Sequence, residues 1–293
     1  MKKSCHSLLL CLVLTLVNLP VLAQTSTPSA PEATAESTPD PNYVELLLPE
    51  VISTRPHATD AWTEGLLLFD GFLYESIGEN GQSALRKVDP QTGNIVQELN
   101  QPADDYAEGL ALVDDRFIQL TWKQEIAYVY DRDTFKQLDT FNYTGEGWGL
   151  SYDGEAVWMS NGSDTLVTRD PKTFEIIREI PITLFGKSVA EISSPQGQSL
   201  GGLNELEVVG DEVYSNIWPT AYALRIDKAT GIVTGIIDGT KLLAPDEKVD
   251  PAIRNYLNGI AYDADTDTFL ITGKYWPKLF EVQWKVADTL RLQ

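Results

Sequence analysis

A short motif that recurs five times constrains the fold of this chain more than any other feature. Each copy begins with an acidic, amide or tryptophan residue and leads into an apolar segment, and the copies are Glu64-Gly65-Leu66, Glu108-Gly109-Leu110, Trp148-Gly149-Leu150, Asn204-Glu205-Leu206 and Asn258-Gly259-Ile260. Successive copies start 44, 40, 56 and 54 residues apart. This spacing fits one four-stranded propeller blade, and the apolar period of a helical repeat is absent. The sequence therefore predicts an all-β fold, a five-bladed β-propeller.

A second landmark marks the turns between strands. It is an Asp followed by two residues and a Thr, and it occurs as Asp89-Pro90-Gln91-Thr92, Asp131-Arg132-Asp133-Thr134, Asp170-Pro171-Lys172-Thr173 and Asp227-Lys228-Ala229-Thr230. An Asp side chain can cap the amides of a hairpin turn. The fifth repeat lacks the landmark and therefore an outer strand, which the residues from Val44 to Ser53 can supply. We expect this N-terminal strand to close the ring, because closure leaves no open sheet edge.

The first 42 residues differ in composition from the rest of the chain. Lys2 and Lys3 precede an apolar run from Leu8 to Val17, and a small-residue site ends at Ala23, so residues 1–23 are interpreted as a secretory signal. Residues 24–42 have the composition of a disordered tether, which leaves residues 43–293 as the folded domain. We expect export to the periplasm or the cell exterior without a membrane anchor, because the apolar run is too short.

Export would leave few groups for thiol or metal chemistry. Cys5, Cys11 and His6 lie in the predicted signal, so the mature chain would keep no cysteine and one histidine, His57, which we interpret as a loop residue. These counts exclude disulfides, cysteine nucleophiles and a multi-histidine zinc site. The chain has 22 basic and 43 acidic residues, a net charge of −21. Such a surface repels nucleic acid and anionic membranes, and we expect a soluble monomer.

The repeat also predicts where a binding site lies. The innermost strand of each blade lines a propeller axis, so residues at the motif starts and strand ends should converge at one mouth. The residues expected there are Trp62, Glu64, Glu108, Trp122, Trp148, Asn204, Glu205, Trp218, Asn258, Lys274 and Trp276. A single tryptophan is more often a core residue, as we expect for Trp158 and Trp284. Several tryptophans at equivalent positions of different blades indicate a pocket for an apolar or cationic group.

Two glutamates at the same repeat position are candidates for proton transfer. Glu108 can simply cap backbone amides in the channel, or it can act as a general acid and base. Aromatic neighbours would raise its pKa by desolvation, toward the value that proton shuttling requires. Glu64 is a second acid, so one carboxyl group could stay ionised while the other carries the proton.

The chain resembles the plant-type glutaminyl-peptide cyclotransferases, which also occur in bacteria. The resemblance runs from about Trp62 to Val282, and its most specific stretches are Asn216-Ile217-Trp218, Leu257-Asn258-Gly259-Ile260 and Ile271-Thr272-Gly273-Lys274 ahead of Trp276-Pro277. It also covers Thr63-Glu64-Gly65-Leu66, Tyr74-Glu75-Ser76, Arg86-Lys87-Val88-Asp89, Glu108-Gly109-Leu110, Thr121-Trp122, Gly147-Trp148-Gly149-Leu150 and Leu203-Asn204-Glu205-Leu206-Glu207.

The resemblance implies a five-bladed propeller whose central pocket cyclises the N-terminal glutamine of peptides or proteins to pyroglutamate and releases ammonia, without a cofactor or catalytic metal. It places the acid–base glutamate at Glu108, the pocket lysine at Lys274 and an amide contact at Asn204, and it assigns the pocket tryptophans to Trp122, Trp148 and Trp218. Trp62 stands where the family usually has phenylalanine, and Glu64 where it usually has glutamine. We expect Trp62, Glu64, Asn258 and Trp276 to contact the substrate as well.

The residue types fit this chemistry by themselves. Glu108 would take a proton from the α-amine and return it to the leaving ammonia, while Asn204, Lys274 or an indole N–H stabilises the oxyanion. Two other functions stay open. One is a non-catalytic propeller that binds peptide ends or scaffolds a complex in the cell envelope. The other is a calcium-dependent propeller hydrolase, with Glu64 and Glu205 holding a structural cation such as calcium on the axis.

Overall fold

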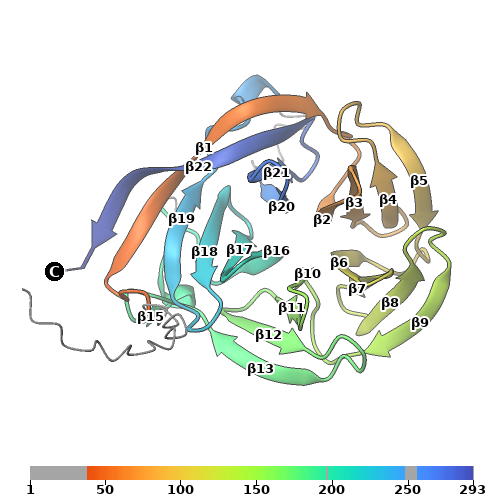
Figure 1. The fold of residues 1–293 in the computed structure, drawn as a ribbon, viewed down its shortest axis with the longest axis horizontal. Helices are drawn as coiled ribbons and strands as arrows, with labels where there is room; N and C mark the ends of the chain where they lie inside the picture. The colour runs from red at the N-terminus through yellow and green to blue at the C-terminus, as the bar shows by residue number, and fades with distance from the viewer. Residues whose placement is uncertain (1–37, 196, 248–255, 293) are drawn as a thin grey trace, which may run out of the picture. The chain divides into compact units, whose positions relative to one another are not determined.

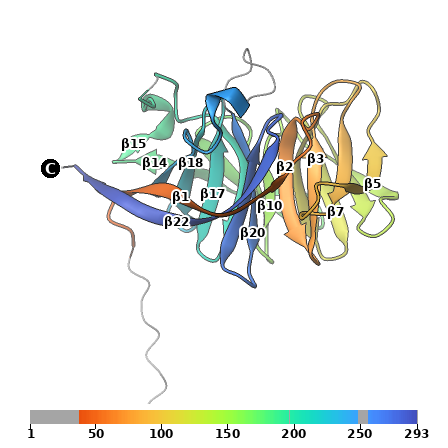
Figure 2. The ribbon, with the colours of Figure 1, turned by 90° about the horizontal axis from the view of Figure 1, so that it is seen from above.

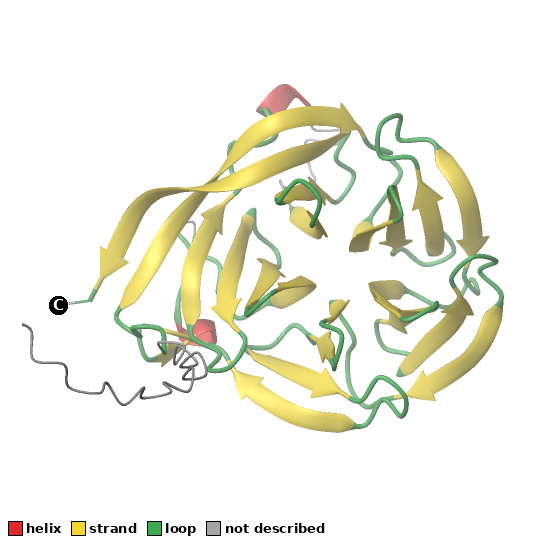
Figure 3. Cartoon of the chain, in the orientation of Figure 1, coloured by secondary structure: helices red, strands yellow, loops and turns green. Residues whose placement is uncertain are grey.

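The structure, a computed structural model, describes residues 38–195, 197–247 and 256–292. The predicted signal, and the predicted tether up to residue 37, lie outside the described residues. The described part is built almost entirely from strands and loops (Figure 3). Its helices are two 3-10 turns, η1 (Val189–Glu191) and η2 (Pro245–Glu247), and within these residues no helix has the length and apolar character needed to cross a membrane. The predicted all-β class is therefore confirmed.

Three sheets each contain four consecutive antiparallel strands (Figure 1). The first has β2 (Thr63–Phe69), β3 (Phe72–Ile77), β4 (Ala84–Val88) and β5 (Ile95–Asn100). The second has β6 (Ala107–Val113), β7 (Arg116–Thr121), β8 (Ile126–Asp131) and β9 (Gln137–Asn142). The third has β10 (Leu150–Tyr152), β11 (Val157–Met159), β12 (Thr165–Arg169) and β13 (Ile176–Pro181).

The remaining long strands form one eight-stranded sheet in the order β16-β17-β18-β19-β1-β22-β21-β20. Its members are β1 (Tyr43–Pro56), β16 (Leu203–Val209), β17 (Glu212–Ile217), β18 (Tyr222–Asp227), β19 (Val233–Asp238), β20 (Leu257–Asp263), β21 (Thr268–Gly273) and β22 (Lys278–Arg291). β1 contains the predicted Val44–Ser53 segment and pairs antiparallel with β22. It also pairs parallel with β19, which the sequence did not predict.

The predicted turn landmark has the expected structure. The Asp89 carboxylate accepts the backbone N–H of Gln91 at 2.8 Å, and Asp227 accepts the backbone N–H of Thr230 at the same distance. Asp131 and Asp170 cap their turns in the same way. Three of these turns lead into outer strands that are largely exposed, as in β9, whereas the Asp227 turn leads into β19, in which buried and half-buried residues alternate. Strands nearer the centre are buried on both faces, as in β7. Hydrophobic clusters therefore lie between neighbouring sheets.

The repeated motif brings the innermost strands into close contact. β2, β6, β10, β16 and β20 touch one another in a closed cycle around a common centre (Figure 1). A Cβ atom on Gly149 would lie 2.1 Å from the Asn204 carbonyl oxygen, and one on Gly109 would lie 2.4 Å from the Leu150 nitrogen. The motif therefore needs glycine at these positions, because a larger residue would push neighbouring strands apart.

Glu205 replaces glycine in the fourth copy of the motif, and its side chain crosses the centre. The carboxylate accepts the backbone N–H of Ile260 at 2.9 Å and that of Leu66 at 3.3 Å. These donors belong to β20 and β2, so one buried side chain ties three innermost strands together. Burial and the nearby Glu207 charge raise the pKa of Glu205 well above its ordinary value. Glu205 thus has the amide-capping role that we considered for Glu108.

Candidate active site

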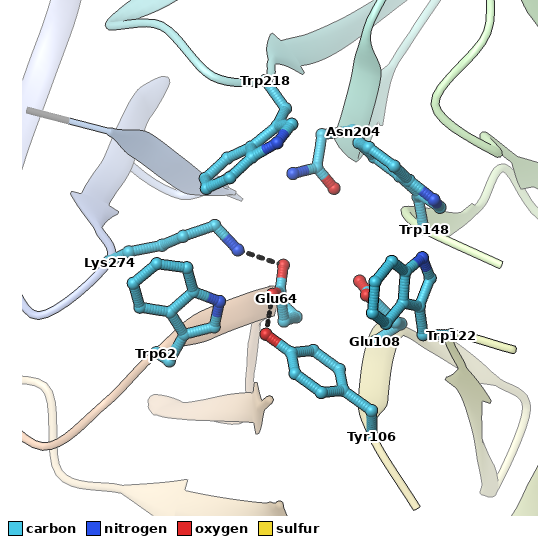
Figure 4. A pocket seen from close by; sticks show the side chains of 9 residues that line it. All are labelled: Trp62, Glu64, Tyr106, Glu108, Trp122, Trp148, Asn204, Trp218 and Lys274. Atoms are coloured by element: carbon cyan, nitrogen blue, oxygen red, sulfur yellow. Dashed lines mark hydrogen bonds and ion pairs between the residues drawn. The ribbon is translucent and has the colours of Figure 1, made fainter. Parts of the chain in front are cut away.

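One cavity of about 140 Å³ lies where the innermost strands begin. Figure 4 shows the side chains that line it, which are Trp62, Glu64, Tyr106, Glu108, Trp122, Trp148, Asn204, Trp218 and Lys274. Glu64, Glu108 and Asn204 are the second residues of β2, β6 and β16, respectively. Trp122, Trp218 and Lys274 are the residues that directly follow β7, β17 and β21, respectively. The repeat thus places equivalent positions of different sheets at one point. Eight of the eleven residues expected there line the cavity.

Glu64 and Lys274 form an ion pair inside this cavity (Figure 4). Their side chains are only 4% and 2% exposed. The Lys274 ammonium group also lies 4.8 Å from the ring centre of Trp62 and 5.0 Å from that of Trp218, so two aromatic faces stabilise the cation. Burial raises the pKa of Glu64, although the Lys274 charge and hydrogen bonds from Trp62 and Tyr106 oppose the rise.

Glu108 is the second acid in the cavity, and it is 5% exposed. Burial raises its pKa well above the ordinary value, and the negative charge of Glu64 raises it further. The Lys274 charge acts in the opposite direction but does not cancel these effects. Two carboxyl groups in one small cavity with a single lysine favour one ionised and one protonated acid. Such a pair can accept and return a proton.

A third acid at the cavity, Glu146, holds two of the indole rings. Its carboxylate accepts the Trp122 indole N–H at 2.8 Å and the Trp148 indole N–H at 3.0 Å. Burial would raise its pKa, but these hydrogen bonds and the charge of Lys123 hold the pKa of Glu146 below its ordinary value. The ionised carboxylate therefore fixes two walls of the cavity, and it occupies both indole donors.

Asn204 lies between Trp148 and Trp218 at the edge of the cavity (Figure 4). Its Oδ1 atom is buried and has no hydrogen-bond partner among the described residues. A buried polar atom without a partner is costly unless a ligand satisfies it. The amide group is thus available to a polar substrate.

Three predicted cavity residues lie elsewhere, and each has another structural role. Glu205 ties the innermost strands together, as described above. Asn258 lies behind Glu64, where its Nδ2 atom donates to the Thr63 carbonyl at 2.7 Å and to Glu64 Oε2 at 3.3 Å. Trp276 is 2% exposed and packs in the core against Phe280. Asn258 and Trp276 therefore do not line the cavity, because their side chains are used inside the fold, and their contact with substrate stays a prediction.

His57 also lies outside the cavity, but it is not a simple loop residue. Its Nε2 atom contacts Glu75 Oε1 at 2.9 Å, and its Nδ1 atom contacts the Trp276 carbonyl at 2.7 Å. Both side chains of the His57–Glu75 pair are almost fully buried. Thr63, which precedes Glu64, donates its hydroxyl to the same Glu75 carboxylate at 2.6 Å. The pair thus joins the end of β1 to the strand that carries Glu64.

Two residues of the site were missed by the sequence analysis, although a signal for them exists: Tyr106, which lines the cavity, and Glu146, which holds two of its rings. Both lie two residues before a motif, as does Trp62. Tyr106 donates its hydroxyl to Glu64 at 3.3 Å. The residue two positions before each of the first three motif copies therefore belongs to the site, in addition to the motif itself. Within residues 38–195, 197–247 and 256–292, His, Cys, Asp and Glu side chains form no group of three arranged to hold a metal ion.

Comparisons with known proteins agree with this arrangement. The model of the family described as glutamine cyclotransferase matches residues 19–284. A glutaminyl-peptide cyclotransferase of Arabidopsis thaliana is 34% identical over 243 residues, which cover 82% of this chain and 72% of that protein. The crystal structure of a glutaminyl cyclase of Myxococcus xanthus matches with a TM-score of 0.73 and 32% identity, covering 84% of this chain and 100% of the other.

Proposed function

The chain belongs to the glutamine cyclotransferase family, and we propose that Glu108 moves the proton in its reaction. The protein is a glutaminyl-peptide cyclotransferase, an enzyme that converts an N-terminal glutamine to pyroglutamate and releases ammonia. The observation that carries the proposal is the cavity itself. It is of single-residue size and holds a buried acid with a raised pKa beside a carboxylate paired to a lysine.

In this reaction the α-amine nitrogen attacks the side-chain amide carbon of the same residue. A C–N bond forms, the bond to the amide nitrogen breaks, and one proton must pass from the attacking to the leaving nitrogen. The active form is the fraction of the enzyme in which Glu108 is ionised: its carboxylate accepts the proton from the amine and then, as the acid, donates it to the departing ammonia. A raised pKa suits both steps, because the same group must accept and release the proton near the working pH.

The other cavity residues have distinct tasks in this proposal. Glu64 stays the ionised acid, supported by Lys274 and Tyr106. The Nδ2 donor of Asn204 and the Lys274 ammonium group stabilise the oxyanion, because the N–H groups of Trp122 and Trp148 are already bound to Glu146. The aromatic walls restrict the glutamine side chain. Well-oriented intramolecular attack can contribute about 7–11 kcal/mol of barrier lowering.

The same proposal covers the architecture. We infer that the eight-stranded sheet consists of two propeller blades, β16–β19 and β20–β22 with β1, which together with the three four-stranded sheets make five. The closed cycle of innermost strands and the antiparallel pairing of β1 with β22 support this inference. We further propose that the protein is exported through residues 1–23, acts as a monomer and needs no cofactor or metal, since the reaction requires only proton transfers.

An assay on a peptide that begins with glutamine tests the proposed function. We expect the purified protein to release ammonia and to reduce the peptide mass by one ammonia, with the same rate after exhaustive treatment with a chelator. Binding of the peptide without turnover would support the non-catalytic propeller instead. Activity that vanishes with the chelator and returns with calcium or zinc would contradict metal-independent proton transfer.

A further inference from the structure

A second hollow opens beside the cavity. It has a volume of about 430 Å³ and is lined by Trp148, Gly162, Ser163, Asp164, Ala190, Ser199, Gly201, Gly202, Trp218 and Pro219. Trp148 and Trp218 line both spaces. In Figure 4 these two rings flank Asn204, whose Oδ1 atom is unpartnered, so the hollow adjoins the cavity at the rings on either side of this amide. We call this second hollow the Asp164 groove.

An inserted segment builds the outer wall of the Asp164 groove. The third and fourth motif copies are 56 residues apart, whereas the first three copies are 44 and 40 apart. The additional chain forms β14 (Thr183–Leu184), β15 (Lys187–Ser188) and η1, and it stands out from one face of the sheets (Figure 2). Ala190, Ser199 and Gly201 of this segment face the groove.

Small side chains keep the groove open next to the two shared rings. A Cβ atom on Gly202 would lie 2.3 Å from the Trp218 carbonyl oxygen, and one on Gly162 would lie 2.6 Å from the Trp148 ring. Residues with side chains would therefore fill the passage between the groove and the rings. The Gly162 N–H donates to the Leu203 carbonyl and the Gly202 carbonyl accepts the Trp218 N–H, so these glycines make room for a chain without offering these backbone groups to it.

We propose that the Asp164 groove binds the residues that follow the N-terminal glutamine of the substrate. This inference rests on the proposed function. The cavity is smaller than the roughly 300–1,000 Å³ of sites that enclose drug-sized ligands, so it holds one residue and the rest of the peptide must leave it. The groove shares Trp148 and Trp218 with the cavity and falls within that size range. It gives an exit path with aromatic walls and small side chains.

The charge of the groove indicates which peptides it prefers. Among the described residues that line it, Asp164 is the one with an ionisable side chain. Its carboxylate accepts the hydroxyl protons of Ser188 and Thr165, which hold it in place. With a net charge of −21 on the whole chain, the groove favours a lysine or arginine after the glutamine over an acidic residue. An exposed ion pair of this kind corresponds to a preference of up to about fivefold.

The test compares glutamine amide, which has no following residue, with a tetrapeptide that begins Gln-Lys. Ala190→Trp fills the groove from its exposed wall, and Ala264→Trp at the exposed turn between β20 and β21 is the matched control. We expect Ala190→Trp to lower kcat/KM for the tetrapeptide about tenfold more than for glutamine amide, mainly through KM. The control should change neither value. Equal losses on both substrates, or no loss on the tetrapeptide, would overturn the proposal.

A second variant keeps the proposal testable if Ala190→Trp does not fold. The wild type should have a higher kcat/KM for a Gln-Lys than for a Gln-Glu tetrapeptide, and Asp164→Asn should remove this difference. Glutamine amide is the control substrate, because it occupies the cavity but not the groove. An unaltered preference in Asp164→Asn would contradict the role of the groove. Absence of turnover of both substrates by the wild type would contradict the proposed function itself, so the two failures are distinguishable.

Discussion

Replacement of His57 by alanine tests whether a buried ion pair secures the end of the N-terminal strand. His57 lies directly after β1 and contacts Glu75 at 2.9 Å, and its backbone N–H donates to the Pro277 carbonyl at 3.0 Å. Burial alone would lower the pKa of His57, but the Glu75 charge and the hydrogen bonds to Glu75 and Trp276 outweigh it and raise that pKa. His57 correspondingly lowers the pKa of Glu75 against the effect of burial.

The expected loss of stability follows from the burial of the pair. The two side chains are 5% and 3% exposed, so His57→Ala would leave a buried carboxylate without its main cation. Breaking such a pair typically costs about 3–5 kcal/mol. We expect the lower end, about 3 kcal/mol, because Thr63 still donates to Glu75. For a domain of this size that corresponds to a decrease of roughly 6–12 °C in Tm.

The stabilisation should depend on pH in a defined way. Because the pKa of His57 is higher in the folded protein than the 6.5 of the unfolded chain, the histidine contributes its full stabilisation below pH 6.5. That stabilisation is lost as the pH rises through the pKa of His57 in the folded protein. Because the pKa of Glu75 is lower in the folded protein than the 4.5 of the unfolded chain, the glutamate contributes its full stabilisation above pH 4.5. That stabilisation is lost as the pH falls through the pKa of Glu75 in the folded protein. The difference between wild type and His57→Ala should therefore be largest between pH 4.5 and 6.5.

Urea unfolding across this pH range measures the effect. The double variant His57→Ala, Glu75→Gln serves as the control, because it removes the stranded charge and should recover part of the loss. A loss below about 1 kcal/mol at pH 6, or one that does not change between pH 6 and pH 9, would refute the reasoning.

Two further predictions concern two other acids, Glu146 and Glu207. Glu146→Ala should raise KM about tenfold and change tryptophan fluorescence, because Trp122 and Trp148 lose their common acceptor. Glu146→Gln keeps one acceptor oxygen, so its KM should rise less. Unchanged KM and fluorescence in both variants would contradict this prediction. Burial raises the pKa of Glu207 to about 8, so the folded wild type retains a proton that the unfolded chain releases, and its stability falls as the pH rises from 4.5 to about 8. Glu207→Gln should therefore raise Tm at pH 9 more than at pH 5, and parallel Tm profiles would count against it.

The repeat made both the fold class and most of the cavity predictable. Its glycines are dictated by contacts between neighbouring innermost strands, so the pattern appears in four of the five copies, with Glu205 in the fourth. Residues at equivalent positions then converge, which is why Glu64, Glu108 and Asn204 could be placed together. The capped Asp-to-Thr turns were predictable because they depend on contacts only a few residues apart.

Contacts between distant segments could not be predicted in this way. Glu205 accepts amides from strands 139 and 55 residues away, and no local pattern distinguishes that role from cation binding. Asn258 and Trp276 occupy repeat positions like those of the cavity residues, but the Asn258 side chain donates to Glu64 and the Trp276 side chain packs in the core. The parallel pairing of β1 with β19 and the groove built by the inserted segment likewise depend on how distant parts meet.

The central claim is that Glu108 carries the proton, and the turnover of Glu108→Gln on a Gln-initiated peptide tests it most directly. The substitution keeps the shape of the side chain, so Tm and KM should stay close to wild type. An exposed Glu155→Gln serves as the matched control. We predict that kcat falls by about 10² or more in Glu108→Gln and is unchanged in the control. Near-wild-type kcat in correctly folded Glu108→Gln would contradict the account.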